Sequence, residues 1–324
     1  MGLKVFVAGG TGVLGRATLP ALLAAGHRVR STARGNAKAE LVRSLGAEPV
    51  DCDLYDLNSL RQAIAGSEVV IRLTTKIGSL RSMRDTKAWA ETNRLRTEGA
   101  HILVDAALAE GVKAYIHESI TFVYADGETR WLNEDSRLDD GGSEVLRAAL
   151  AGEREEARFS EAGGRGIVLR FGGFYGADAP STEETIALAR KRMLFQIGPG
   201  TNYFSSIHVS DAGRAVAAAL AAPAGTYNVC DDQPVLFAEY LRALTAAIGA
   251  KTPLHMPGFL GSLMFGQAWN YFSRSQKVSN ARLKTLAGWQ PAVKSVLEGW
   301  PLVATELRRV SPQAAVHEDK ESAA

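Results

Sequence analysis

Leu3-Lys4-Val5-Phe6-Val7-Ala8 runs directly into Gly9-Gly10-Thr11-Gly12-Val13-Leu14-Gly15, and this stretch decides the fold. The apolar run predicts a buried strand, and Leu19, Leu22 and Leu23 predict an amphipathic helix after the glycines. Gly-x-x-Gly-x-x-Gly between a strand and a helix is typical of a turn that holds a dinucleotide, because glycines permit the tight turn and the approach of a pyrophosphate. The pyrophosphate then lies on the N–H groups of the helix N-terminus. We expect cofactor contacts from Gly9, Gly10, Thr11, Gly12, Val13, Leu14 and Gly15.

Strands and helices alternate from this turn to Phe171. The pattern predicts strands over residues 27–32, 48–50, 68–73, 112–117 and 166–171, and helices over 37–45, 56–65, 87–110 and 143–161. Such alternation predicts an α/β, Rossmann-type doubly wound parallel sheet, with a smaller, mostly helical C-terminal substrate domain. We expect a dinucleotide-binding domain at 1–171 plus 203–231, a substrate-binding region at 172–202 plus 232–310, and a disordered tail at 311–324.

Composition narrows the class of partner. The 324 residues carry a formal net charge of +2, which argues against nucleic acid or an anionic membrane. Cys52 and Cys230 fit buried thiols of a reducing compartment better than a disulfide framework. No apolar run is long enough to span a bilayer, and the six histidines are too scattered for a metal site. We expect a cytoplasmic protein with a small-molecule substrate and no metal, and the Ala-rich segment Ala148 to Ala157 would permit a homodimer.

The end of the second expected strand indicates which cofactor binds. An acidic residue there would bind the ribose 2′-hydroxyl of NAD, whereas a cation would bind the 2′-phosphate of NADP. The segment Val29 to Gly35 has no acid and contains Arg34, so NADP(H) is favoured, with NAD(H) as the alternative. Further cofactor contacts are expected from Asp53 and Leu54 at the adenine. Thr74 and Thr75, at the end of the fourth strand, either line the ribose or are turn residues.

A polar cluster closes the fifth expected strand, beside the position of a nicotinamide. We hypothesise that Ser119 or Thr121 binds a substrate carbonyl and that Tyr124 or His117 supplies or relays a proton. Two structural alternatives stay open. His117 would order the strand end, and Tyr124 would only pack.

Several landmarks resemble the extended, atypical short-chain dehydrogenase/reductase superfamily, of the NAD-dependent epimerase/dehydratase type. They occur in order over nearly the whole chain: Asp53-Leu54-x-Asp56, Asn93 with Thr97 and Gly99, Phe122-Val123-Tyr124, Leu169 to Gly176, Ser206 to Asp211, and Tyr227-Asn228-Val229. The resemblance implies a Rossmann fold, a pyridine dinucleotide, and a place for Asn93 among the cofactor-binding residues.

The chain departs from this family at the catalytic positions. The usual proton donor is the Tyr of Tyr-x-x-x-Lys, and no tyrosine here has a lysine four residues on. Aligning Glu153 with the glutamate that follows the motif puts Val145 and Ala149 at the Tyr and Lys positions. Counted back from Tyr124, the usual Ser or Thr falls on Ile120, which Ser119 and Thr121 flank. Gly173 stands where nucleotide-sugar enzymes carry an Asn that faces the substrate. A nucleotide sugar is therefore disfavoured.

The expected substrate contacts are largely apolar. They are Trp131, Gly173, Phe174, Tyr175 and Tyr203, with walls from Ile77 to Arg84 and from the helix that carries Phe259, Met264, Phe265, Trp269 and Phe272. Such walls favour an aromatic or alicyclic substrate. We therefore expect an NADP(H)-dependent oxidoreductase that acts on a carbonyl or activated alkene. The alternatives are a non-catalytic NADP(H)-binding sensor or regulatory protein, and a nucleotide-sugar epimerase or dehydratase.

Overall fold

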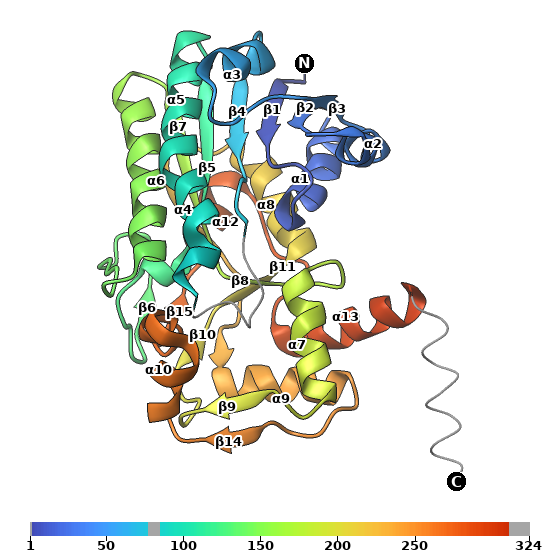
Figure 1. Ribbon diagram of the computed structural model, residues 1–324, viewed down its shortest axis with the longest axis vertical. Coiled ribbons are helices and arrows are strands. Elements are labelled where there is room, and N and C mark those ends of the chain that lie inside the picture. The colour runs from blue at the N-terminus through green and yellow to red at the C-terminus, as the bar shows by residue number, and fades with distance from the viewer. Residues whose placement is uncertain (1, 77–84, 311–324) are drawn as a thin grey trace.

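A seven-stranded parallel sheet forms the centre of the computed structural model, which describes residues 2–76 and 85–310 (Figure 1). Its strands lie in the order β12-β7-β5-β4-β1-β2-β3, and each neighbouring pair is parallel. The order reverses direction between β1 and β4, which places the ligand crevice at the carboxyl ends of these strands. The predicted doubly wound sheet is confirmed. The strand bounds are β1 (Lys4–Ala8), β2 (Arg28–Thr32), β3 (Glu48–Val50), β4 (Val69–Arg72), β5 (Ala114–Ile120), β7 (Arg165–Phe171) and β12 (Gly225–Val229).

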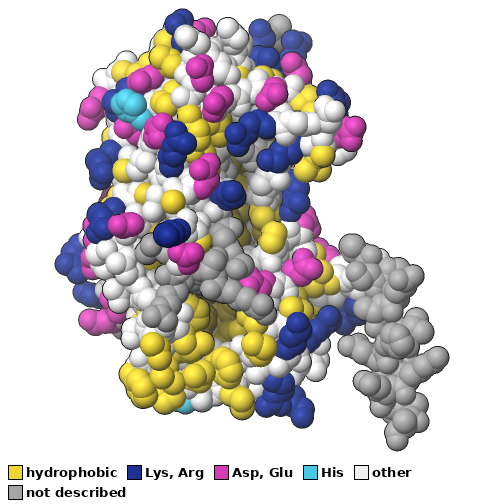
Figure 2. Space-filling model, viewed as in Figure 1, with side chains coloured by type: hydrophobic (Ala, Val, Ile, Leu, Met, Phe, Trp, Pro, Cys, Tyr) yellow, Lys and Arg dark blue, Asp and Glu magenta, His cyan; other side chains and the backbone are white. Residues whose placement is uncertain are grey.

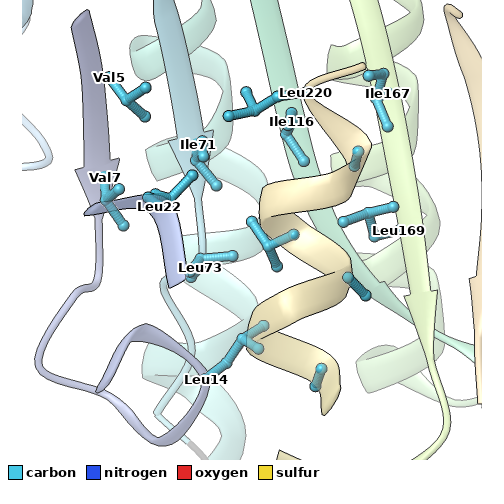
Figure 3. Packing of buried hydrophobic residues seen from close by; sticks show 14 of the residues in the cluster. Val5, Val7, Leu14, Leu22, Ile71, Leu73, Ile116, Ile167, Leu169 and Leu220 are labelled. Atoms are coloured by element: carbon cyan, nitrogen blue, oxygen red, sulfur yellow. The ribbon is translucent and has the colours of Figure 1, made fainter. Parts of the chain in front are cut away.

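Helices cover both faces of the sheet because successive strand residues point to opposite sides. On one face, α1 (Val13–Ala24) and α8 (Val209–Ala219) pack on residues such as Val5, Ile71 and Leu169 (Figure 3). On the other face, α3 (Leu57–Ile64), α5 (Ala100–Ala109) and α6 (Glu144–Glu161) enclose Phe6 and Val70. The two faces bury separate apolar clusters. α2 (Asn36–Ser44) joins β2 to β3.

The long helix expected over 87–110 is present as one continuous helical segment, but it is not a regular α-helix throughout. A 3₁₀ turn η2 (Thr86–Trp89) leads into α4 (Ala90–Arg94), followed by a π-helical turn η3 (Leu95–Gly99) and α5. Inside this segment the hydroxyl of Thr97 donates to the carbonyl of Asn93 at 2.8 Å. Hydrophobic periodicity reveals a long helical segment, but it does not reveal a turn that carries one extra residue.

The C-terminal half adds short strand pairs and helices beyond the carboxyl edge of the sheet (Figure 1). Figure 2 shows apolar side chains gathered at this end of the molecule, where Leu254, Phe259 and Leu263 are exposed. No helix in the described part of the chain is long and apolar enough to cross a membrane. The strands are β6 (Trp131–Leu132), β8 (Gly173–Tyr175), β9 (Phe195–Ile197), β10 (Tyr203–Phe204), β11 (Ser206–His208), β13 (Val235–Leu236), β14 (Leu254–Met256) and β15 (Lys277–Val278). The helices are η4 (Thr121–Val123), α7 (Pro180–Arg190), α9 (Phe237–Ala247), α10 (Phe259–Phe265), η5 (Gly266–Ala268), α11 (Trp269–Phe272), α12 (Ala281–Ala287) and α13 (Val296–Val310).

Asp211 of α8 binds the segment between α12 and α13. Its carboxylate, which is completely buried, accepts the N–H groups of Ala292 at 3.1 Å and Val293 at 2.9 Å. The indole of Trp289 donates to the carbonyl of Asp211 at 3.2 Å. A single side chain therefore satisfies two backbone donors of the segment that precedes α13.

Candidate active site

The glycines of the first turn are required by geometry. Gly9 adopts a φ of +101°, and a Cβ there would lie 2.7 Å from the carbonyl oxygen of Leu73. A Cβ on Gly10 would lie 2.1 Å from the hydroxyl of Ser31, and one on Gly15 would lie 2.2 Å from the oxygen of Gly9. These distances are far below van der Waals contact. The turn can therefore pack against β2 and β4 only without side chains.

The N-terminus of α1 is left open by the same turn. Gly12 is the N-cap, and no side chain caps the helix. The N–H of Gly12 bonds the oxygen of Gly9 at 3.1 Å, whereas those of Val13 and Leu14 have no acceptor among residues 2–76 and 85–310. The Leu14 side chain is buried and Thr11 is half-buried, so Leu14 can offer a ligand only its backbone. These residues fit a pyrophosphate, because an uncapped helix N-terminus offers N–H donors and a partial positive charge.

A second anion-attracting position lies at the end of β2. Arg34 is exposed, and Gly35, with a φ of +80°, is the N-cap of α2 without a side-chain cap. Burial raises the pKa of Cys52, which follows β3, to about 11, and Arg34 is close enough to oppose that shift. A guanidinium and an uncapped helix N-terminus therefore stand together at this strand end.

The expected adenine and ribose contacts lie along the same edge. Asp53 is exposed, with one carboxylate oxygen accepting the N–H of Tyr55 at 3.0 Å, and Leu54 packs beside the cluster under α3. Thr74 is buried and Thr75 half-buried, directly after β4. The side-chain oxygen of Asn93 is buried and has no hydrogen-bond partner in the described ranges.

A buried polar network occupies the end of β5. Ser119 donates to Glu153 of α6 at 2.6 Å, and Arg170 of β7 binds both oxygens of that carboxylate, at 2.9 and 2.6 Å. Arg170 also donates to the hydroxyl of Tyr124 at 3.0 Å, and this hydroxyl donates to Asn228 at 2.8 Å. Burial raises the pKa of Tyr124 to about 12, although Arg170 opposes this. Both the Ser119 and the Tyr124 hydroxyls are thus engaged within the fold.

His117 lies in a buried cationic cluster. The ring is fully buried, and a Cβ on Gly152 of α6 would come within 2.5 Å of its Nε2 atom. Burial lowers the pKa of His117 well below its ordinary value, and the nearby Arg72 and Arg96 lower it further, so the imidazole is neutral. Both guanidiniums are buried and keep unpaired N–H groups among the described residues, with Glu118 as the nearby carboxylate.

Aromatic rings gather beside Thr121. The hydroxyl of Thr121 makes no hydrogen bond within the described part of the chain. The ring of Phe122 lies 5.0 Å from that of Phe272 and 6.1 Å from that of Phe204, measured between centroids. A Cβ on Gly173 would lie 2.6 Å from the Phe204 ring, so Phe204 fills the space next to that glycine. The position expected to disfavour a nucleotide sugar is therefore part of an aromatic wall.

The other expected substrate residues fall into separate environments. Trp131 is 54 % exposed, and the ammonium of Lys277 lies 4.7 Å from its ring centre and 4.9 Å from that of Tyr203. Phe174 is half-buried, with its ring 5.3 Å from that of Phe171. Tyr175 is fully buried in the core against Trp300. The wall expected from residues 77–84 lies outside the described residues.

Sequence reasoning missed the residues that organise the site. Glu153, Arg170 and Asn228 hold the end of β5, and Arg72 and Arg96 charge its surroundings. Arg72 offered a signal, because it is a charged residue inside the apolar run from Val69 to Leu73. No local sequence pattern marks Arg96 as buried, because it lies in the π-helical turn, which hydrophobic periodicity does not reveal.

The sheet order, the glycine turn and the uncapped α1 together define a Rossmann-type dinucleotide-binding protein. The family model of the NAD-dependent epimerase/dehydratase family matches residues 5–230. The chain belongs to that family, whose members are NAD(P)-dependent oxidoreductase- or epimerase-like enzymes, and the resemblance seen in its motifs is confirmed.

Relatives and solved structures agree with this assignment. The chain is 33 % identical to a 3-diazoavenalumate denitrifying reductase of Streptomyces over 92 % of its own length and 99 % of the relative's. It is 28 % identical to a 4-hydroxy-2-methyl-3-oxo-4-farnesyl-3,4-dihydroquinoline-1-oxide ketoreductase of Stigmatella aurantiaca, over 77 % of this chain and 74 % of the relative. The human epimerase family protein SDR39U1, solved with NADPH, has the same fold with a TM-score of 0.78 at 22 % identity, covering 94 % of this chain and all of that one.

Proposed function

We propose that this protein is an NADP(H)-dependent reductase of a small aromatic molecule that carries a ketone, an enone or a similarly electron-poor centre. The observation that carries the proposal is the uncapped glycine turn of α1 together with Arg34 after β2. The first fits a pyrophosphate, and the second, beside the open N-terminus of α2, fits a 2′-phosphate. When bound, the cofactor supplies a hydride.

The substrate class is supported by the aromatic wall. Phe122, Phe204 and Phe272 are half-buried and in ring contact, and Phe122 directly follows Thr121, whose hydroxyl makes no hydrogen bond within residues 2–76 and 85–310. Flat aromatic ligands pack well on such surfaces, and one hydroxyl donor would orient a carbonyl oxygen. Two relatives are named as reductases, and one of those names specifies a ketone reduction on a dihydroquinoline.

Cofactor preference is tested by calorimetric titration with NADPH and NADH. Arg34→Ala is expected to weaken NADPH binding by about 10- to 100-fold, because one charge-assisted contact contributes about 1.5–3 kcal/mol. NADH binding should stay within about twofold, since NADH has no 2′-phosphate. The matched control is Arg43→Ala near the other end of α2, which should change neither affinity. Equal losses for both cofactors would contradict the assignment of Arg34.

Reductase activity is tested by NADPH oxidation with a panel of aryl ketones, enones and an arenediazonium salt. We expect turnover with at least one class. A protein that binds NADPH tightly but oxidises it with no member of the panel would instead fit the second candidate, a non-catalytic NADP(H)-binding sensor. Val145 and Ala149, which cannot donate a proton, favour that candidate.

A further inference from the structure

Tyr271 lies where the family's catalytic residues are missing. Comparison with the family's motifs places Ile120, Val145 and Ala149 at the usual Ser, Tyr and Lys positions. In the fold, Tyr271 of α11 belongs to one buried cluster with Ala149, and Ile120 packs against that cluster. Tyr271, from α11, therefore packs next to Ile120 and Ala149, two of the positions that carry the catalytic residues in relatives.

Tyr271 packs among aromatic rings, and within the described ranges its phenol has no hydrogen-bond partner. Its ring lies 5.8 Å from Phe122 and 4.8 Å from Phe272, so it forms part of the aromatic wall. The side chain is 4 % exposed, and its hydroxyl makes no hydrogen bond within residues 2–76 and 85–310. The Tyr124 hydroxyl, by contrast, is bound by both Arg170 and Asn228.

A buried cation comes from a turn that packs on the same helix: a Cβ on Gly152 of α6 would lie 3.0 Å from the carbonyl oxygen of Arg96, and Ala149, three residues earlier on α6, belongs to the Tyr271 cluster. Arg96 comes from the π-helical turn η3, is buried, and has two guanidinium nitrogens without partners among the described residues. Burial raises the pKa of Tyr271 to about 12, and Arg96 opposes this rise. The lysine of Tyr-x-x-x-Lys acts on its tyrosine in the same direction, because a positive charge favours the phenolate.

We propose that Tyr271 is the proton donor of this enzyme and that Arg96 is the positioning cation that stabilises the phenolate left after the proton is transferred. This inference rests on the proposed reductase function. As hydride reaches the substrate carbonyl carbon, the C=O π bond breaks and the oxygen takes the proton of Tyr271, giving an alcohol. The phenolate that remains regains a proton from water.

The first test needs only the protein and NADP⁺. Difluorotyrosine placed at position 271 has a more acidic phenol, so its ionisation can be followed by absorbance while the fold is intact. NADP⁺ is expected to lower this pKa by about one unit or more, because the oxidised nicotinamide is positive. Arg96→Met should raise the pKa, and Arg96→Lys should largely restore it. A pKa that responds to neither change would overturn the proposal.

The second test uses any substrate that the panel identifies. Tyr271→Phe keeps the ring contacts and is expected to lower kcat by about 10²- to 10⁴-fold while the Kd for NADPH stays within about twofold. The matched control, Tyr227→Phe, alters a buried tyrosine of β12 on the α8 side of the sheet and should leave kcat unchanged. Full activity of Tyr271→Phe would overturn the proposal. If the wild-type protein binds no pyridine cofactor, the proposed function itself fails.

Discussion

At the scale of single residues, Glu153 links β5 to β7 by accepting hydrogen bonds from Ser119 and Arg170. Its carboxylate receives Ser119 and both arms of Arg170, and the Arg170 and Glu153 side chains are only 5 % and 11 % exposed. Glu153→Gln leaves a buried guanidinium without its counter-charge, so we expect a loss of about 3 kcal/mol in the free energy of unfolding. Urea denaturation measures it. Glu155→Gln, two residues along the same helix, breaks only partly exposed ion pairs with Arg158 and His101 and should cost less than about 1 kcal/mol. Equal losses in the free energy of unfolding for the two variants would show that the buried Glu153–Arg170 pair stabilises the fold no more than the exposed contacts of Glu155.

His117 gives the protein a pH-dependent stability. Its pKa in the fold is well below the ordinary value of 6.5, because burial and then Arg72 and Arg96 disfavour the charged ring. Just below pH 6.5, His117 is therefore protonated in the unfolded chain but neutral in the folded chain. The stabilisation is complete above about pH 6.5 and is lost as the pH falls below it.

This dependence can be measured by unfolding at about pH 5 and about pH 8. His117→Gln should lose less stability between these values than the wild type, because glutamine does not titrate. His255→Gln replaces an exposed histidine and should keep the wild-type slope. Identical slopes in all three proteins would contradict the assignment.

At the scale of elements, the glycine turn contains one glycine that the fold requires, Gly15, and one that we expect mainly to affect cofactor binding, Gly12. Gly15→Ala forces a Cβ to within 2.2 Å of the Gly9 oxygen, so we expect a destabilised fold. At Gly12 the new Cβ would lie 3.4 Å from the same oxygen, a distance that the fold tolerates. Gly12→Ala should therefore melt near the wild-type temperature but weaken NADPH binding by about tenfold, because its methyl group stands at the phosphate position. Thermal melting and calorimetry distinguish the two. A Gly12→Ala protein that binds normally would argue against a pyrophosphate on this helix.

Elements were predictable where one local pattern sufficed. The strands and the turn around Gly9 to Gly15 follow from hydrophobic runs and glycine spacing, and β3 agrees in both bounds with the prediction. The polar network was not predictable, because it joins β5, α6, β7 and β12 across long sequence separations. Part of the aromatic wall was expected, since Phe272 belongs to the segment named as a substrate wall, but the ring contacts of Phe122 with Phe204 and Phe272 were not. Tyr271 lies between Trp269 and Phe272 in the segment expected to wall the substrate, but its packing at the end of β5 joins residues about 150 positions apart, and no local pattern indicates that contact.

At the scale of the whole molecule, Asp211 joins α8, which packs against α1, to the chain that leads into α13. Asp211→Ala leaves the buried N–H group of Val293, and the partly buried one of Ala292, without their acceptor, at an expected cost of about 1–3 kcal/mol. Limited proteolysis should then cut between α12 and α13 sooner than in the wild type. Asp178→Ala removes an exposed carboxylate and should behave like the wild type. Unchanged unfolding and proteolysis in Asp211→Ala would show that α8 and this segment are joined by apolar packing alone.

The π-helical turn at Leu95–Gly99 has a consequence for how such enzymes diverge. A single inserted residue in a helix rotates its neighbours, and here it accompanies an inward-facing arginine beside an active-site strand. Under the proposed role of Arg96, the positive charge that the lysine of Tyr-x-x-x-Lys supplies in relatives comes here from a different helical segment. A chain of this family that lacks Tyr-x-x-x-Lys therefore need not be inactive. A genome survey that selects enzymes by that motif would miss such a chain.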